Sequence, residues 1–555
     1  MWDKGTPRRT LLFLSAIAVF ALFLRCLHLL DLNRYFVASP DSYFFHWLAQ
    51  RVMAGEGPPP DAPAGALYTL HTGLAYPMAY IAKAVSSVFN ISGADALSLT
   101  AKFLPPILGL ISIAVIYLAA AKIYDRRVAL FSALAWALMY YALLVGAAGY
   151  LDRDGLSLLL LMVGAFVFYL SGNWHLHIGK RDIGWVVAGL VVLGLEWLLY
   201  VEWTFIGPVG LLMVLLVYFL VKLLLGYADR VQTEQSPLRR LTAAVGEVNW
   251  RAFTLIIGVN IVAIIVLYRN AAGWFRAMID LFHASKASGV VEMSGMNIWN
   301  LFDYQLLLIP IILGIYIAWK KRSSGTIFVF CWFFATLVLG LFSKRILLYG
   351  VPAACVISGV GLAFLWEWRR HGQHQELRNV GTVALLCLLI LTSFVTALAL
   401  NSDPGMSPSK EWQDALTYLR EETPPESEIM TNWGWGYWIL DLGQRRPVVD
   451  NGYYYYDEER LHDVGLAYAT TEPSEAAQIM EKYGADYLVF SNLDLEISGI
   501  ILGWTGLDEG DPTFAENSLV VTALNGEFQS GAGLDVVFRS APDSEVVILR
   551  LTGSG

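Results

Sequence analysis

The sequence contains few charged residues for its length. Only 15% of its 555 residues are Asp, Glu, Lys or Arg, whereas 56% are hydrophobic and the mean hydropathy is +0.52. A soluble domain usually carries about 25% charged residues, so this composition excludes an ordinary soluble enzyme and indicates a polytopic membrane protein. The absence of a basic tract argues against a nucleic-acid partner.

Cysteine is also scarce, and its positions exclude a disulfide framework. All four cysteines lie in apolar segments, and the last 155 residues have none: Cys26, Cys331, Cys355 and Cys387. These positions are typical of small buried hydrophobic residues. Cysteine usage therefore does not identify the compartment.

Long apolar segments fill the first 400 residues. A span of roughly 20 apolar residues crosses the hydrocarbon core, and about eleven candidates are present by that length rule: near 10–31, 97–121, 128–148, 156–172, 184–203, 205–224, 252–268, 303–319, 325–342, 346–366 and 379–400. No small-residue cleavage pattern follows the first candidate, which is therefore predicted to be a retained anchor.

Basic residues at the ends of these segments predict the orientation. Lys and Arg collect on the cytoplasmic side of membrane proteins, and one side of the predicted spans holds Lys4, Arg8, Arg9, Lys122, Arg126, Arg127, Lys180, Arg181, Arg230, Arg239, Arg240, Arg251, Lys320, Lys321, Arg322, Arg369, Arg370 and Arg378. With the amino terminus in the cytoplasm, the carboxy-terminal region lies outside.

The predicted fold class is a polytopic α-helical membrane region followed by a mixed α/β extramembrane domain. Residues 1–400 form the membrane region, with a long first outer loop at 32–96 that carries short interfacial helices and a mobile outer loop at 269–302. Residues 401–555 form the outer domain. Its predicted helices are 410–422 and 474–483, and its predicted strands are 428–430, 486–490, 518–524, 534–539 and 545–551.

Carboxylates occur at the outer ends of the predicted spans. Asp41 follows the first span, Asp152 and Asp154 follow another, and Glu292 lies in the mobile outer loop. Individually each has a plain alternative, since Asp41 could cap a helix, the Asp-Arg-Asp sequence could be a polar turn, and Glu292 could be a solvated loop acid. Together in one compartment they predict a divalent-metal site, because hard cations prefer several carboxylate oxygens.

Two further groups are candidate binding residues. Arg345 lies in a basic pair at the outer end of a span, where the positive-inside rule does not expect it, so it is either a partner for an anion or a snorkelling anchor. Asn432, Trp433, Gly434, Trp435 and Gly436 form a turn rich in glycine and tryptophan, which predicts either packing at a domain boundary or a peptide-binding pocket.

These motifs, in this order, resemble those of the single-subunit oligosaccharyltransferases of archaea and bacteria. Asp41 in Asp-Ser-Tyr resembles the first acidic motif, and Asp152-Arg153-Asp154 resembles the Asp-x-Asp motif. Val290-Val291-Glu292 resembles the end of the outer-loop motif, with Gly289 replacing the usual hydroxyl residue. Arg345, followed by Tyr349 and Pro352, resembles the arginine helix. The resemblance covers nearly the whole chain.

One motif departs from the family pattern. The Trp-Trp-Asp-Tyr-Gly sequence, whose Asp binds the hydroxyl at position +2 of the acceptor sequon, reads Asn432-Trp433-Gly434-Trp435-Gly436 here, so that Asp is missing. The segment Asp494–Ile501 is only loosely similar to the second sequon-pocket helix. Weaker or different selection at position +2 is the resulting expectation.

The resemblance implies a GT-C type membrane glycosyltransferase that acts in N-glycosylation. It would transfer an oligosaccharide from a polyprenyl phosphate or pyrophosphate carrier to an acceptor asparagine, working as a monomer. By resemblance, Asp41 and Glu292 are catalytic, the ligands of a Mg²⁺ or Mn²⁺ ion are Asp41, Asp152, Asp154 and Glu292, and Arg345 binds the lipid phosphate. Two alternatives stay open: a related GT-C enzyme that glycosylates a lipid or a Ser/Thr hydroxyl, and a transporter or assembly protein.

Overall fold

The computed structural model describes most of the chain in separate segments. These are residues 7–30, 41–56, 72–171, 207–230, 236–240, 306–321, 323–341, 344–370, 374–399, 407–451, 458–496, 498–505, 516–540 and 545–552, with four isolated helical positions between 187 and 195. Structural statements below refer to these residues.

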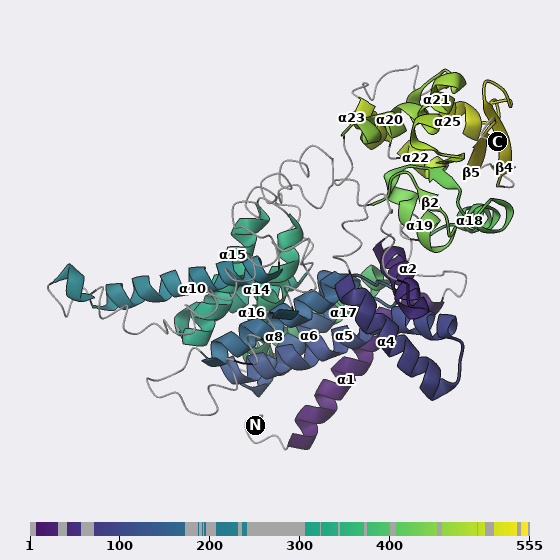
Figure 1. The fold of residues 1–555 in the computed structure, drawn as a ribbon. Coiled ribbons are helices and arrows are strands. Elements are labelled where there is room, and N and C mark those ends of the chain that lie inside the picture. Colours follow the sequence, from purple (N-terminus) through teal and green to yellow (C-terminus); the bar gives the residue numbers. More distant parts are fainter. Residues whose placement is uncertain are drawn as a thin grey trace.

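A bundle of apolar helices occupies most of the described part of the first 400 residues (Figure 1). Its helices are α1 (Pro7–Cys26), α5 (Gly93–Ile123), α6 (Arg126–Leu138), α7 (Tyr140–Leu144), α8 (Arg153–Ser171), α10 (Gly207–Asp229), α14 (Leu308–Lys321), α15 (Ser324–Gly340), α16 (Leu347–Trp368) and α17 (Gln375–Ala399), with short 3₁₀ turns η1 (Leu27–Leu30) and η4 (Lys344–Ile346). Nine of the predicted spans coincide with these helices, whereas 252–268 and most of 184–203 lie outside the described residues.

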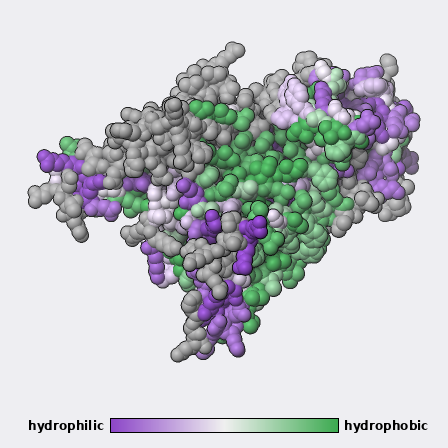
Figure 2. All heavy atoms as spheres, turned by 90° about the horizontal axis from the view of Figure 1, so that it is seen from below, coloured by the Kyte–Doolittle hydropathy of each residue, from purple (hydrophilic) through white to green (hydrophobic). Residues whose placement is uncertain are grey.

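The surface of this bundle is suited to lipid. Four described helices are long and apolar enough to cross a membrane: Arg8–Cys26, Gly93–Ile123, Leu347–Trp368 and Gln375–Ala399. Among the described residues, every exposed large hydrophobic side chain lies between Leu11 and Leu398, and none lies in the carboxy-terminal region. Figure 2 shows the broad hydrophobic surface that results. The chain is therefore a multi-pass membrane protein, as its composition predicts.

Glycine brings the central helix α16 close to its neighbours. A Cβ on Gly314 of α14 would clash with the carbonyl oxygen of Ile357, and one on Gly361 of α16 would clash with that of Pro310. Small residues at such crossings let two helix backbones approach each other in a membrane, where packing rather than water exclusion drives association. Thus α16 is almost entirely buried at the centre of the bundle.

Two helices between α1 and α5 lie near the carboxy-terminal domain. These are α2 (Asp41–Ala54) and α4 (Thr72–Phe89), in the region predicted to be a long first outer loop. Helix α2 lies directly beside the carboxy-terminal domain, and α4 packs against α2 (Figure 1). Residues of α2 and α4 share one hydrophobic core with residues of that domain, including Tyr43, Phe44, Trp412 and Trp438.

The carboxy-terminal domain is built on a five-stranded mixed sheet of order β2-β1-β3-β5-β4. The strands are β1 (Glu428–Met430), β2 (Arg446–Pro447), β3 (Tyr487–Ser491), β4 (Leu534–Arg539) and β5 (Val546–Leu551). Strand β1 is parallel to both β2 and β3, while β5 is antiparallel to both β3 and β4. The predicted mixed α/β character of this region is confirmed.

Both faces of the sheet are buried, because its side chains alternate between two cores. Tyr487 and Val489 of β3 belong to the core shared with α2, and Leu488 and Phe490 belong to the opposite core. The first face packs against α18 (Lys410–Glu422) and α19 (Gly436–Asp441). The second packs against α20 (Glu458–Ala469), α21 (Pro473–Tyr483), α23 (Ser498–Thr505) and α25 (Leu519–Leu524), and α22 (Asn492–Glu496) follows β3.

The strand predicted at 518–524 is wrong, because these residues form helix α25. Ser518 precedes the helix, and the hydroxyl of Thr522 donates to the carbonyl oxygen of Ser518 at 3.0 Å. Five of its six residues are buried. A short run that is apolar on all sides cannot be assigned to helix or strand by periodicity. In the structure these residues pack as a helix against β3 and α20.

The predicted span at 128–148 is interrupted. Helix α6 ends at Leu138, Met139 is extended with φ −68° and ψ 131°, and the chain then continues as the short helix α7. The hydroxyl of Ser393 in α17 donates to the carbonyl oxygen of Leu138 at 2.8 Å, which satisfies an acceptor that the helix end leaves open.

Candidate active site

Asp41 is the first residue of α2. A carboxylate in the first turn of a helix is favoured by the partial positive charge of the amino-terminal N–H groups. Asp41 is half-buried, whereas the residues that follow it, from Ser42 to His46, are buried. The position agrees with the helix-start alternative for Asp41, and it also holds the carboxylate at a fixed end of a well-packed helix.

The segment that leads into Asp152 is fixed by three separate elements. The N–H of Ala148 donates to the carbonyl of Arg25 at 2.8 Å, and the N–H of Gly149 donates to that of Lys102 at 2.9 Å. Gly149 has φ +79°, a conformation that favours glycine. The N–H of Leu151 then donates to the hydroxyl of Ser42 at 2.9 Å.

The last of these bonds brings two predicted acids together. Ser42 follows Asp41, and Leu151 precedes Asp152, so the hydrogen bond joins the neighbours of both carboxylates. Asp152 and Asp154 are buried, and Asp154 occupies the first turn of α8. The Asp-Arg-Asp sequence is not a separate turn, because Arg153 and Asp154 begin α8 directly after Asp152.

The structure does not describe the side chains of two predicted site residues. Glu292 lies outside the described residues. The backbone of Arg345 lies in η4, next to α15 and α16, but its side chain is not among those described. Within the described residues, no three His, Cys, Asp or Glu side chains are arranged to hold one metal ion. The structure thus places the start of α2 beside the segment that leads into Asp152, and the predicted metal ligands themselves stay a prediction.

The five residues of the predicted acceptor turn lie directly after β1. Asn432 precedes η5 (Trp433–Trp435), and its side-chain oxygen accepts a hydrogen bond from the N–H of Gly434 at 3.1 Å. Gly436 begins α19, and a Cβ there would clash with the backbone of Asp450 and Val449. By contrast, a Cβ on Gly434 would meet only the side-chain oxygen of Asn432, at 3.8 Å.

Sheet topology places Asp494 beside this turn. Strands β1 and β3 are parallel neighbours, so their carboxyl ends lie at the same edge of the sheet, and ligands commonly bind at such edges. The turn follows β1 and Asp494 follows β3. Asp494 is buried, and it accepts hydrogen bonds from the Trp435 indole and the Ser491 N–H, both at 2.7 Å.

The environment of Asp494 favours its protonated form. Burial raises the pKa of Asp494 to about 7, and the hydrogen bonds from Trp435, Ser491 and Asn432 oppose this rise. The sequence offered only a loose motif match at Asp494. The parallel pairing of β1 and β3, which brings it to the turn, is visible only in the fold.

Aromatic contacts connect the turn to the helix of Asp41. Phe44 stacks on Tyr437 with ring centroids 4.8 Å apart, and Tyr43 meets Trp438 edge-on at 6.3 Å. Each helix contributes residues from its first turn, so the starts of α2 and α19 lie near each other. Asp41 and the Asn432–Gly436 turn are therefore at the same end of this helix pair, an arrangement that suits an acid acting on a group bound at the turn.

Sequence comparison finds relatives among glycosyltransferases. The oligosaccharyltransferase subunit STT3B of rice is 25% identical over 234 residues, which are 34% of this chain and 32% of that protein. Dolichyl-phosphooligosaccharide-protein glycotransferase 2 of Pyrococcus horikoshii is 23% identical over 272 residues, 47% of this chain and 33% of that protein. The matched region thus spans about a third of the relatives' length. No protein-family model matches the chain.

Structural comparison extends the likeness to almost the whole chain. Oligosaccharyltransferase AglB of Archaeoglobus fulgidus, solved with an inhibitory peptide and a dolichol-phosphate, has a TM-score of 0.75 at 15% identity and covers 97% of this chain and 80% of that one. ArnT of Cupriavidus metallidurans, solved with undecaprenyl phosphate, has a TM-score of 0.52 at 14% identity and covers 99% of both.

These comparisons confirm the predicted resemblance and fold class. The chain has the GT-C membrane fold of AglB with its carboxy-terminal α/β domain, and its similarity in sequence is to oligosaccharyltransferases, which are glycosyltransferases. At these identities the structural likeness establishes the fold alone.

Proposed function

We propose that this protein transfers an oligosaccharide from a polyprenyl phosphate or pyrophosphate carrier to an asparagine side chain. The observation that carries the proposal is the meeting of three segments: the start of α2 with Asp41, the buried residues Asp152–Asp154 at the start of α8, and the Asn432–Gly436 turn. Donor chemistry and acceptor binding then occur at one place. The peptide and dolichol-phosphate bound by AglB agree with these two substrate classes.

The reaction must overcome the poor nucleophilicity of an amide nitrogen. Its lone pair is delocalised into the carbonyl, so acids that accept hydrogen bonds from the amide N–H groups orient it and weaken that delocalisation. We assign this role to Asp41 and Glu292. The nitrogen forms the new bond to the sugar, the sugar–oxygen bond to the phosphate breaks with its electrons on the phosphate, and a carboxylate takes the amide proton.

The predicted ligands have the chemistry that a Mg²⁺ or Mn²⁺ ion prefers, since all of their donors are carboxylate oxygens. Among the described residues no three such side chains are arranged to hold one ion, so the proposal rests on donor chemistry and on the contact between the start of α2 and the segment before Asp152. The proposed ligands are Asp41, Asp152, Asp154 and Glu292. When bound, the ion would stabilise the negative charge of the leaving phosphate. Arg345 is the proposed partner of the lipid phosphate, since a guanidinium matches phosphate geometry.

We also propose the orientation and the division of the chain. Lys and Arg place the amino terminus in the cytoplasm, so residues 401–555 would form an extracytoplasmic domain on a membrane region of residues 1–400. The outer loop 269–302 would close over the acceptor with Glu292. The protein would work as a monomer on a lipid-linked oligosaccharide and an acceptor polypeptide.

A GT-C enzyme that glycosylates a lipid or a Ser/Thr hydroxyl is the second candidate, since ArnT, solved with undecaprenyl phosphate, shares the fold. Purified protein, a lipid-linked oligosaccharide and an Asn-x-Thr peptide separate the two. We expect glycopeptide to form with Mn²⁺ in the wild type and to be lost in Asp41→Asn. Transfer to a lipid acceptor or to a Ser/Thr peptide, with none to asparagine, would favour the second candidate.

A further inference from the structure

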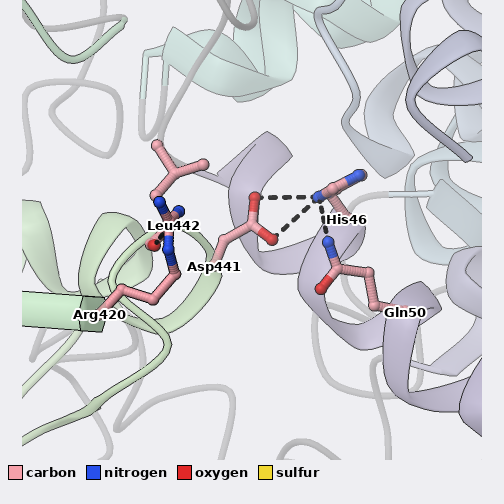
Figure 3. Close-up of polar contacts among 5 residues, drawn as sticks. All are labelled: His46, Gln50, Arg420, Asp441 and Leu442. Atoms are coloured by element: carbon pink, nitrogen blue, oxygen red, sulfur yellow. Dashed lines mark hydrogen bonds and ion pairs between the residues drawn. The ribbon is translucent and has the colours of Figure 1, made fainter. Parts of the chain in front are cut away.

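A buried ion pair joins the helix of Asp41 to the carboxy-terminal domain. Nδ1 of His46 in α2 lies 2.9 Å and 3.0 Å from the two carboxylate oxygens of Asp441 at the end of α19 (Figure 3). His46 is 4% exposed and Asp441 is 3% exposed. The two residues are 395 positions apart in the sequence.

The distances around Nδ1 of His46 indicate where the proton of the His46–Asp441 pair lies. The amide nitrogen of Gln50 lies 3.3 Å from the same His46 nitrogen, and that nitrogen carries at most one proton. With two carboxylate oxygens nearer, an ionised Asp441 requires Nδ1–H to point toward Asp441. Burial raises the pKa of the Asp441 carboxyl, and the charge and hydrogen bond of His46 oppose that rise.

Asp441 is placed where a carboxylate is costly. It is the last residue of α19, and the carboxyl end of a helix carries partial negative charge that disfavours an acid. The nearby Arg420 donates to the carbonyl oxygen of Leu442 at 3.4 Å, so its guanidinium holds the end of α19. Among the described residues, the side chain that pairs with the Asp441 carboxylate is His46. A buried carboxylate at this unfavourable position indicates that Asp441 has a role beyond packing.

The pair completes an ordered set of contacts between α2 and α19. The first turns meet through Phe44 and Tyr437, and the ion pair lies further along both helices. Two contacts at different points along a pair of helices fix their angle, which one contact alone would leave free. The angle sets how Asp41, at the start of α2, faces the acceptor turn at the start of α19.

We propose that the His46–Asp441 pair is a positioning latch that holds the acceptor-binding turn at the correct place relative to Asp41. The inference rests on the proposed function, because it concerns delivery of the acceptor amide to the acid. His46 and Asp441 touch neither substrate. Misplacing reacting groups by about 1 Å can cost roughly 100-fold in rate, so a small change of helix angle is enough to matter.

The test compares two uncharged replacements of His46. Asparagine places an N–H donor near the position of Nδ1, whereas leucine has similar bulk and no donor. We expect His46→Leu to lower kcat/KM for the acceptor peptide about 10- to 100-fold and to leave KM for the lipid-linked donor within about two-fold, while His46→Asn restores most of the loss. Asp441→Leu, which has similar bulk and removes the acceptor for Nδ1–H, is the second variant in case His46→Leu does not fold, and the same loss is expected of it.

A matched control breaks an ion pair elsewhere in the same domain. Lys482 of α21 lies 2.6 Å from both Glu459 and Asp463 of α20, far along the chain from the turn. Lys482→Ala should leave both kinetic constants unchanged. Equal loss in His46→Leu and His46→Asn, or a donor KM that rises as much as the acceptor effect, would overturn the latch.

Hydrogen exchange separates failure of the latch from failure of the proposed function. In His46→Leu, amides of residues 41–54 and 433–441 should exchange about ten-fold faster or more, and those of α21 should not change. If the wild type transfers nothing to asparagine, the proposed function fails while this measurement still reports the latch. Unchanged exchange in both segments would refute the latch even in an active enzyme.

Discussion

Replacing Gly434 by aspartate should strengthen selection for a hydroxyl at position +2 of the acceptor sequon, if the Asn432–Gly436 turn binds the acceptor as proposed. In the family motif the equivalent Asp binds the hydroxyl at position +2 of the sequon. The structure provides room for the Cβ of an aspartate, because a Cβ at Gly434 would meet only the Asn432 side-chain oxygen at 3.8 Å. Gly434 is also not among the residues with positive φ, so its backbone conformation accepts an L-residue.

The expected gain in selectivity follows from the free energy of one hydrogen bond to a charged group. Such a bond contributes about 1.5–3 kcal/mol, and each 1.4 kcal/mol corresponds to about a ten-fold preference. Because the position is buried, part of the gain is offset by desolvation of the new carboxylate. We therefore expect Gly434→Asp to prefer Asn-x-Thr over Asn-x-Ala by about 10-fold more than the wild type does.

The assay measures initial rates with a panel of Asn-x-Thr, Asn-x-Ser and Asn-x-Ala peptides. Gly434→Ala controls for the added Cβ and should behave like the wild type, since the space is open. The reasoning would be refuted by a wild type that already rejects Asn-x-Ala strictly, or by a Gly434→Asp protein that is active with unchanged selectivity.

Three further predictions concern the acids. Asp41→Asn and Glu292→Gln should each lower transfer by 100-fold or more and leave detergent-solubilised protein folded by circular dichroism; near-normal rates in both would remove these residues from the mechanism. Chelation with EDTA should stop transfer and added Mn²⁺ or Mg²⁺ should restore it, with glycopeptide measured by mass spectrometry; full activity in EDTA would contradict the metal site. Asp494 should make the free energy of unfolding fall as pH rises. The pKa of Asp494 is about 7 in the folded state and 3.8 in the unfolded state, so between these values only the folded state holds the proton. Releasing it lowers the free energy of unfolding by up to roughly 4 kcal/mol by pH 7. Thermal unfolding between pH 4 and 8 should show this decline in the wild type and a flatter profile in Asp494→Asn, and equal slopes would show that Asp494 titrates normally.

Much of the architecture could be predicted because local patterns are strong in this chain. Long apolar runs predicted the helices, and the amphipathic segment at 410–422 predicted α18 at the observed bounds. Residues 518–524 were the exception, since a short run buried on all sides contains no period. The site was harder to predict from the sequence. The order of Asp41, Asp152 and Asp154 indicated a shared site, but the hydrogen bond between Leu151 and Ser42, which connects the segments that carry these acids, could be found only in the structure.

Other site residues carried no local signal. His46 is a single histidine in the apolar helix α2, and Asp441 is a single acid in the buried helix α19. Their pairing depends on how α2 packs against α19, across 395 residues of sequence. Asp494 likewise reaches the acceptor turn only because β1 and β3 are parallel neighbours. Long-range pairing of this kind is set by the tertiary fold and is absent from the local pattern.

The most direct test of the proposed function is the identity of the atom that receives the sugar. Purified protein should be incubated with Mn²⁺, an extracted lipid-linked oligosaccharide and a peptide containing one asparagine in an Asn-x-Thr sequence, and the product should be fragmented by mass spectrometry. The proposed function predicts glycan on the asparagine side-chain nitrogen in the wild type and none in Asp41→Asn. Glycan on the threonine hydroxyl, or on a lipid acceptor with the peptide unmodified, would contradict it.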